Sequence, residues 1–124
     1  MSVKHTQDVE AQVVKSGEKT TIQVLISAQE GPNFALRRFV MGPGGGIPEH
    51  TNTVEHEQYI LQGHATIGIG KETFDVHAGD VVFIPEGVHH WYRNMGEENF
   101  EFLCIIPNKS DEIKIITKGS QLGL

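Results

Sequence analysis

The stretch Gly79-Asp80-Val81-Val82-Phe83-Ile84-Pro85-Glu86-Gly87-Val88-His89-His90-Trp91-Tyr92-Arg93-Asn94 decides the fold of this chain. It holds two short runs rich in β-branched and aromatic residues, 80–84 and 90–93, separated by a proline and a glycine. Such runs between turn residues predict two short β-strands. Successive strand residues point to opposite faces, so only one imidazole of the histidine pair can point inward.

The same alternation of short apolar runs and turn residues continues on both sides of this stretch. We expect further strands at residues 11–14, 21–27, 35–40, 57–61, 65–69, 72–76, 100–106 and 113–117. Most strand starts lie about ten residues apart or closer, and no window shows a clean helical period. The spacing predicts an all-β sandwich or barrel and argues against βαβ units.

Three segments rich in glycine, asparagine and proline connect these strands. Residues 68–71 predict one β-hairpin, and residues 94–97 predict a second, which joins the strands at Tyr92 and Phe100. Residues 41–46 predict a long Gly-Pro turn that leads directly to the first histidine cluster.

The composition excludes several classes of function. The formal net charge is −6, which argues against nucleic acid or an anionic membrane as the main partner. A single cysteine excludes an internal disulfide and a multi-cysteine zinc site. No stretch has the length of a membrane span, and the polar residues 1–10 contain no apolar signal core, so we expect a cytoplasmic protein.

Four of the seven histidines lie in two short windows, with His50 and His56 in the first and His89 and His90 in the second. Asn52 shares a strand face with His50, and His56 has the same parity if no turn breaks the strand. Three imidazoles that converge from two strands form a site that suits Zn, Cu, Fe, Ni or Mn. The remaining histidines, which we interpret as surface or structural residues, are His5, His64 and His77.

Residues 79–94 match the pattern G-x5-P-x-G-x2-H-x3-N at every fixed position, and in this they resemble the second motif of the cupin superfamily. Upstream, Gly44 opens a G-x5-H pattern that ends at His50, and residues 55–63 are similar to the rest of the first motif, G-x5-H-x-H-x3,4-E-x6-G. The resemblance covers about residues 35–107. It implies a small antiparallel jelly-roll β-barrel with a metal ion in its lumen.

The resemblance also implies a set of metal ligands. Cupins usually hold the metal with two His and one Glu of the first motif and one His of the second. Mapped onto this chain, the first ligand is His50 and the last is His90. His56 stands at the position of the Glu, and some small cupins use His there within a Glu-His-Glu triplet like the one in this chain.

Asn52 stands where the family has its second His, and this leaves three alternatives for metal binding. An amide oxygen is a weak metal ligand, and as a neutral one it would leave the ion its full charge. If Asn52 does not bind the metal, three imidazoles and open coordination positions remain, as in catalytic sites. A third alternative is that metal binding is lost and the barrel is only a pocket.

Strand parity predicts which side chains line the lumen. In the strand at 100–106, Phe102 and Cys104 share a face opposite Glu101, and because Glu101 is better left in water we expect the first two to face a substrate. Cys104 is either a small buried hydrophobe or a soft, oxidation-prone thiol near the metal. Tyr92 shares the inward parity of the second motif and is a candidate hydrogen-bond donor to substrate, or else a packed barrel aromatic.

For two pairs of charged residues, the sequence does not define which side chain points into the barrel. Arg37 and Arg38 are neighbours, so only one can point inward, where it would bind a carboxylate substrate. The alternative is that both lie on the exterior or at an interface. Glu55 and Glu57 flank His56 and should face away from it, as solvated or structural residues, unless one of them orients an imidazole.

A fold and a metal site do not define a reaction. We favour a metal-dependent enzyme of dioxygenase type acting on a small oxygen-bearing organic substrate, because a neutral histidine set beside open positions resembles non-heme oxygenase sites. The alternatives are a metal-dependent isomerase, lyase or decarboxylase, or a non-catalytic cupin that binds or senses a small molecule. A structural role, as in storage cupins, ranks last.

We expect one domain over residues 1–124, with the barrel core at about 35–107 and with strands at 9–27 and a tail at 108–124 packed on it. Small cupins commonly dimerise, often by exchanging N-terminal strands. The resemblance therefore implies a homodimer, and residues 9–14 and 21–26 could supply the exchanged edge.

Overall fold

The computed structural model describes residues 1–116, which form β-strands and one short 3-10 helix. The helix is η1 (Thr6–Asp8), and the strands are β1 (Gln12–Val13), β2 (Glu18–Ile26), β3 (Phe34–Thr51), β4 (His56–Gln62), β5 (His64–Ile69), β6 (Glu72–His77), β7 (Val81–Ile84), β8 (His90–Arg93), β9 (Phe100–Pro107) and β10 (Lys114–Ile115). The all-β prediction is confirmed. Within the described residues, no helix is long and apolar enough to cross a membrane.

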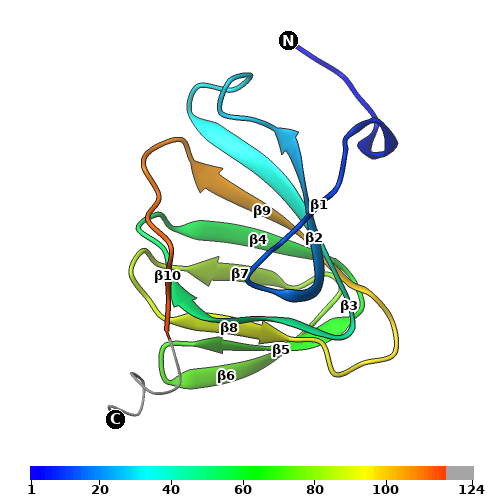
Figure 1. The fold of residues 1–124 in the computed structure, drawn as a ribbon, viewed down its shortest axis with the longest axis vertical. Helices are drawn as coiled ribbons and strands as arrows, with labels where there is room; N and C mark the ends of the chain where they lie inside the picture. Colours follow the sequence, from blue (N-terminus) through cyan, green and yellow to red (C-terminus); the bar gives the residue numbers. More distant parts are fainter. Residues whose placement is uncertain (117–124) are drawn as a thin grey trace.

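The long strand β3 belongs to both halves of the barrel. Its first part, residues 34–41, pairs with β9 and with β2, and its second part, residues 46–50, pairs with β8. Beyond β9 lie β4 and β7, and beyond β8 lie β5 and β6. All these pairings are antiparallel, and the sheet curls on itself as expected for the jelly-roll barrel (Figure 1).

The prediction of a separate turn at residues 41–46 is wrong, because β3 continues through the whole Gly-Pro run. The run acts as a corner at which one strand passes from the first half of the barrel to the second. Gly44 has φ +80°, a backbone conformation that side chains disfavour. At Gly46 an added Cβ would lie 2.5 Å from the carbonyl oxygen of Tyr92, so only glycine lets β8 approach this closely.

Of the two predicted hairpins, one is confirmed and one is wrong. β5 and β6 form the expected hairpin. Residues 94–97 do not form one, because β8 pairs with β3 and β5, whereas β9 pairs with β3 and β4. The amide of the buried Asn94 donates to the carbonyls of Met41 (2.9 Å) and Glu98 (2.8 Å). These bonds guide the chain across the barrel end and prevent it from turning back.

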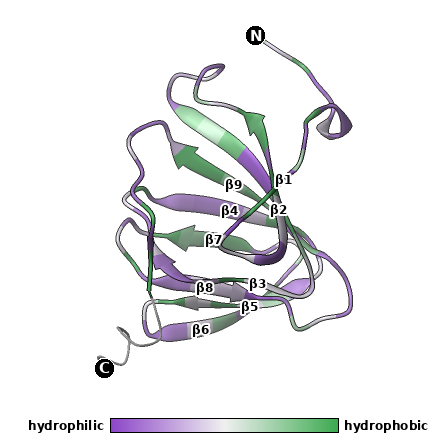
Figure 2. Ribbon diagram, in the orientation of Figure 1, coloured by the Kyte–Doolittle hydropathy of each residue, from purple (hydrophilic) through white to green (hydrophobic). Residues whose placement is uncertain are grey.

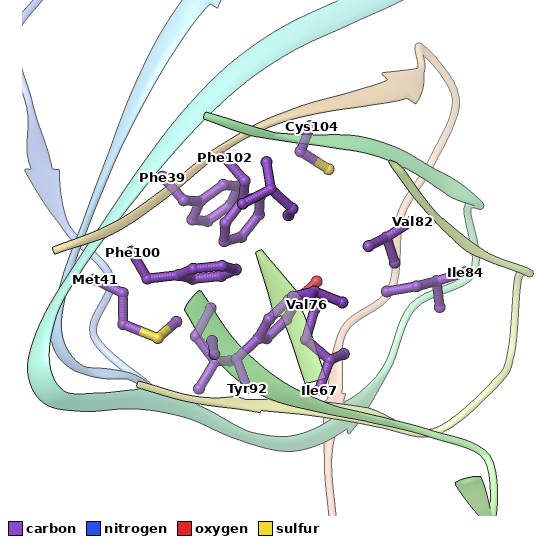
Figure 3. Packing of buried hydrophobic residues seen from close by; sticks show 13 residues of the cluster. Phe39, Met41, Ile67, Val76, Val82, Ile84, Tyr92, Phe100, Phe102 and Cys104 are labelled. Atoms are coloured by element: carbon purple, nitrogen blue, oxygen red, sulfur yellow. The ribbon is translucent and has the colours of Figure 1, made fainter. Parts of the chain in front are cut away.

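The core contains a stack of aromatic rings on β3, β8 and β9 (Figure 3). The Phe102 ring lies 4.9 Å from Phe39, 5.3 Å from Tyr92 and 5.4 Å from Phe100, measured between ring centroids. Offset aromatic pairs at this spacing add stability beyond the burial of their surface. In contrast, β4 is coloured largely hydrophilic in Figure 2, although His56 and Gln58 on this strand are buried.

The two ends of the described chain pack on this barrel. β1 pairs with β2, and the amide of Gln23 on β2 donates to the carbonyls of Thr6 and Val9, both at 2.9 Å. β10 pairs with the end of β3 and opposes Ile115 to His50. The strand predicted at 113–117 is thus confirmed over two residues, and its last residue lies outside the described ones.

Candidate metal centre

Three histidines from three strands meet inside the barrel. His50 lies near the end of β3, His56 begins β4 and His90 begins β8. The register of β3 and β8 opposes His50 directly to His90. All three are buried, whereas His89 turns outward, with its Nδ1 3.6 Å from a carboxylate oxygen of Glu49. The structure therefore brings together the three imidazoles that the motifs select.

The spacing of these rings lies on either side of the spacing expected around a common metal ion. An imidazole that binds zinc through Nε2 at about 2.1 Å has its ring centre about 3.2 Å from the ion, which puts two such rings roughly 4.5–5.3 Å apart. The ring centroids of His50 and His90 are 4.1 Å apart, and those of His56 and His90 are 5.5 Å apart. In residues 1–116, no three His, Cys, Asp or Glu side chains are already gathered as they would be around an ion. Small rotations of the rings would have to complete the set.

Main-chain carbonyls orient two of the imidazoles. His50 Nδ1 lies 2.8 Å from the carbonyl oxygen of Pro48, and His90 Nδ1 lies 3.0 Å from that of Val88. A carbonyl only accepts, so each Nδ1 carries the hydrogen and each Nε2 keeps a free lone pair. The Nε2 atoms of His90 and His56 are buried and have no hydrogen-bond partner within residues 1–116. Since an unsatisfied buried polar atom costs about 1–3 kcal/mol, these atoms fit a site made for an ion.

Cys104 lies behind His56 and does not line the cavity. Its Sγ is 3.2 Å from His56 Nδ1, and it accepts a hydrogen bond of 3.1 Å from Arg37. The prediction that Cys104 faces a substrate is therefore corrected. The thiol touches the imidazole nitrogen on the far side from Nε2, where an Nδ1–H can donate to sulfur and leave Nε2 free.

Burial keeps the three imidazoles neutral. It is the main cause that lowers the pKa of His56 to about 3, with the charge of Arg37 as a second cause. Burial likewise lowers the pKa of His90 to about 4, helped by His50. The pKa of His50 is also lowered by burial, against the opposing effect of the Pro48 carbonyl. A neutral imidazole is the form that binds metals.

Asn52 is buried beside the histidines and lines the same cavity. Its amide nitrogen donates to a carboxylate oxygen of Asp111 at 3.0 Å, and its Oδ1 is buried with no hydrogen-bond partner in residues 1–116. Asp111 also accepts from the backbone N–H of Thr53 at 3.1 Å. With the nitrogen engaged, the amide oxygen is the atom left for a ligand. The sequence contains no signal for Asp111, because it lies in a C-terminal segment far from both motifs.

The imidazoles open into a cavity of about 200 Å³, whose walls include Phe39, Phe102 and Tyr92. Gln58 Nε2 donates to the Tyr92 hydroxyl at 2.7 Å, so the tyrosine proton remains available to a bound molecule. Burial raises the pKa of Tyr92, which therefore stays protonated. Gln58 was missed at the sequence level, although it shares the inward parity of His56 two residues earlier.

Glu55 and Glu57 lie outside the barrel, as their parity predicts, and both are exposed. A hydrogen bond with Glu55 is the main cause that raises the pKa of Glu57 to about 7. The two carboxyl groups thus interact with each other on the outer face.

Comparison with known proteins identifies a family. The family model described as Cupin domain matches residues 37–106. The 1-methylthio-D-xylulose 5-phosphate methylsulfurylase of Rhodospirillum rubrum is 32% identical over 99 residues, which are 80% of this chain and 63% of that protein. The match to a second curated relative covers 62% of that protein. This chain therefore spans less than two thirds of the length of either relative.

Two solved structures resemble the whole barrel. The polyketide cyclase RemF from Streptomyces resistomycificus has a TM-score of 0.87 and 29% identity, over 94% of this chain and 86% of that one. A cupin-2 domain from Rhodospirillum rubrum has a TM-score of 0.86 and 28% identity, over 99% and 85% of the two chains.

Proposed function

This chain belongs to the cupin family, and from that premise we propose that it is a metal-dependent enzyme of dioxygenase type that acts in the cytoplasm on a small oxygen-bearing organic substrate. One observation carries the proposal. The buried Nε2 atoms of His56 and His90 have no hydrogen-bond partner in the part of the chain that the structure describes, although they lie at the wall of a cavity large enough for a small molecule.

We infer that His50, His56 and His90 hold one divalent transition metal ion, such as Mn, Fe, Ni, Cu or Zn, with the Asn52 amide oxygen as a weak further ligand. When bound, such an ion supplies Lewis-acid or redox chemistry to the cavity. The chain's own contribution is orientation. The carbonyl of Val88 fixes the tautomer of His90, and Asp111 fixes the amide of Asn52.

The cavity walls suit a small substrate with an apolar part. Phe39 and Phe102 offer stacked aromatic faces that exclude water, and Tyr92 offers a hydroxyl proton to a substrate oxygen. The dioxygenase type is favoured because no Asp or Glu of the described residues lines the cavity, so the ligand set is neutral. A neutral set with open positions leaves room for both a substrate and dioxygen.

A second candidate is a metal-dependent isomerase, lyase or decarboxylase that uses no dioxygen. The likeness to a polyketide cyclase at 29% identity supports it, as does the Tyr92 hydroxyl, which could protonate a substrate carbon or oxygen. The same ion would then act as a Lewis acid only.

An oxygen electrode can distinguish these functions. Metal-reconstituted protein is mixed with a panel of small enols, phenols and 2-oxo acids, and products are analysed in parallel under air and under nitrogen. Our proposal predicts substrate-dependent oxygen uptake that is lost after chelation and in His56→Ala. Product formation under nitrogen would favour the second candidate, whereas binding of panel compounds with no turnover would overturn the enzyme proposal in favour of a binding or sensor cupin.

A further inference from the structure

Arg37 is a polar feature of the cavity that the proposed metal does not explain. It lies on the first part of β3 and lines the cavity. Its neighbour Arg38 points to the opposite face, where it forms an ion pair with Glu101 and donates to Gln23 at 2.7 Å. Because successive side chains of β3 point to opposite faces, one of the two arginines points inward and the other outward.

Arg37 differs from the other arginines in its partners. The chain has three arginines, and both Arg38 and Arg93 lie within 4.0 Å of a glutamate. Within residues 1–116, no ion pair includes Arg37. Its Nη2 instead contacts the Sγ of Cys104 at 3.1 Å and Nδ1 of His56 at 3.4 Å.

One N–H donor of the Arg37 guanidinium makes no hydrogen bond within residues 1–116. Its Nε is buried and has no hydrogen-bond partner among the described residues, and its central carbon lies 5.2 Å from the centre of the Phe39 ring. Nε and Nη2 lie on the same edge of a guanidinium, the edge that grips a carboxylate through two parallel hydrogen bonds. The ring of Phe39 attracts the guanidinium at this distance and restricts its motion, which lowers the entropic cost of binding an anion.

The charges around the cavity are a second argument for a bound anion. Arg37 is half-buried, so its charge is only partly solvated, and a thiol sulfur is a weak acceptor for its N–H groups. No Asp or Glu of residues 1–116 lines the cavity, and Asp111, which is bonded to Asn52 and Thr53, lies outside it. A divalent ion on the histidines would add further positive charge. The cavity therefore lacks an anion, which a bound molecule can supply.

We propose that Arg37 is a specificity-determining residue and that the substrate is a small organic acid, whose carboxylate binds the guanidinium while its apolar part lies against Phe39 and Phe102. This inference rests on the proposed function in that it treats the cavity as the substrate site. It adds the chemical class of the substrate, which neither the fold nor the metal ligands define.

Benzoate and benzamide are suitable probes, because they have nearly the same shape and differ in charge. Their binding to the full chain is measured by calorimetry, in metal-free and in metal-loaded protein. The metal-free titration isolates Arg37, because no ion is present to bind the carboxylate. We expect the wild type to bind benzoate about tenfold or more tightly than benzamide, the size expected of a charge-assisted hydrogen bond in a buried site.

Three variants complete the design. Arg37→Gln should abolish the preference for benzoate, and Arg37→Lys, which keeps a charge but loses the planar fork, should retain only part of it. Arg38→Gln is the matched control on the opposite face and should keep the full preference. If Arg37→Gln does not fold, the lysine variant still decides, because an undiminished preference there would contradict planar carboxylate binding.

The outcomes separate this inference from the proposed function. A benzoate preference that depends on Arg37 in a protein that takes up no metal supports the inference and refutes the metal-dependent function. A protein that binds metal but does not distinguish benzoate from benzamide, or that distinguishes them equally well in Arg37→Gln, overturns the inference alone.

Discussion

The carbonyls of Pro48 and Val88 determine which nitrogen His50 and His90 present to the cavity. Each carbonyl sits two residues before its histidine, so the local backbone sets the tautomer. His56 has no such carbonyl, and Cys104 and Arg37 lie beside its Nδ1 instead. The ligand set is therefore oriented partly by its own strands and partly by side chains of β3 and β9.

Asn52 is the residue at which this site departs from its family, and its contribution can be measured. Because an amide oxygen is a weak ligand, Asn52→Ala should lower metal affinity by about tenfold, the lower end of the range for supporting groups. The affinity is measured by competition with a chromophoric chelator. A loss as large as that in His90→Ala would contradict this account and make Asn52 a principal ligand.

The buried histidines should make the metal-free protein sensitive to acid. The pKa of His56 is about 3 in the folded chain and about 6.5 in the unfolded chain, so between these values only the unfolded chain binds the proton. The free energy of unfolding should therefore fall as the pH drops from 6.5 towards 4, by the order of 3 kcal/mol for this residue.

Urea unfolding between pH 4 and pH 7.5 tests this expectation. His56→Gln cannot be protonated, so its stability should depend less on pH than that of the wild type over this window. Parallel stability curves for the two proteins would mean that His56 is not kept neutral by the fold.

At the scale of strands and turns, the local sequence predicted one connection correctly and two wrongly. The hairpin between β5 and β6 follows from two residues of turn sequence and was predicted correctly. The run at residues 41–46 carries the same kind of turn signal, but pairing with β2 and β8 keeps it in β3. Asn94 is a residue type typical of turns, but its bond to Met41 joins residues 53 positions apart and forms only when β3 is in place.

The sequence likewise predicted some residues of the candidate site and not others. Motif spacing identifies His50, His56 and His90, and strand parity would have identified Gln58. Neither could identify Asp111, which meets Asn52 only through folding of the C-terminal segment. The direction of Arg37 was open because parity alone does not say which face of a strand is inside.

The aromatic stack on β9 should carry much of the stability of this strand. Phe102 is buried and touches three other aromatic rings, so Phe102→Ala should lower the free energy of unfolding by about 3–5 kcal/mol. Phe34→Ala is the control, because Phe34 is 61% exposed, and it should cost about 1 kcal/mol or less. Urea unfolding measures both, and equal losses would contradict the packing described.

For the whole molecule, the outer face of β4, β7 and β9 presents a surface that a second copy could cover. The register places Tyr59 beside Val81, and Phe83 and Ile105 on either side of Glu57. These apolar side chains are exposed, Val81 by 78%. Exposed apolar side chains grouped in this way, here around one glutamate, are typical of interaction sites. We propose that two chains pair through this face, whereas β1 stays on its own barrel, where it pairs with β2.

Light scattering after size-exclusion chromatography tests the dimer. The wild type should have the mass of two chains, and Val81→Glu should shift it to one. Val13→Glu alters an exposed residue of β1 and should leave the dimer intact. A wild type of monomeric mass would contradict the proposal, and a dimer broken by Val13→Glu alone would point to exchange of N-terminal strands.

Metal content of the intact protein tests the central claim most directly. Protein purified without chelator is analysed for transition metals by mass spectrometry, with His90→Ala as the test variant and His89→Ala as the control from the exposed neighbour. We predict close to one metal ion per chain in the wild type and in His89→Ala, and a small fraction of that in His90→Ala. A wild type that stays metal-free after incubation with Mn, Fe, Ni, Cu and Zn, or a His90→Ala variant that binds metal as well as the wild type, would contradict the account.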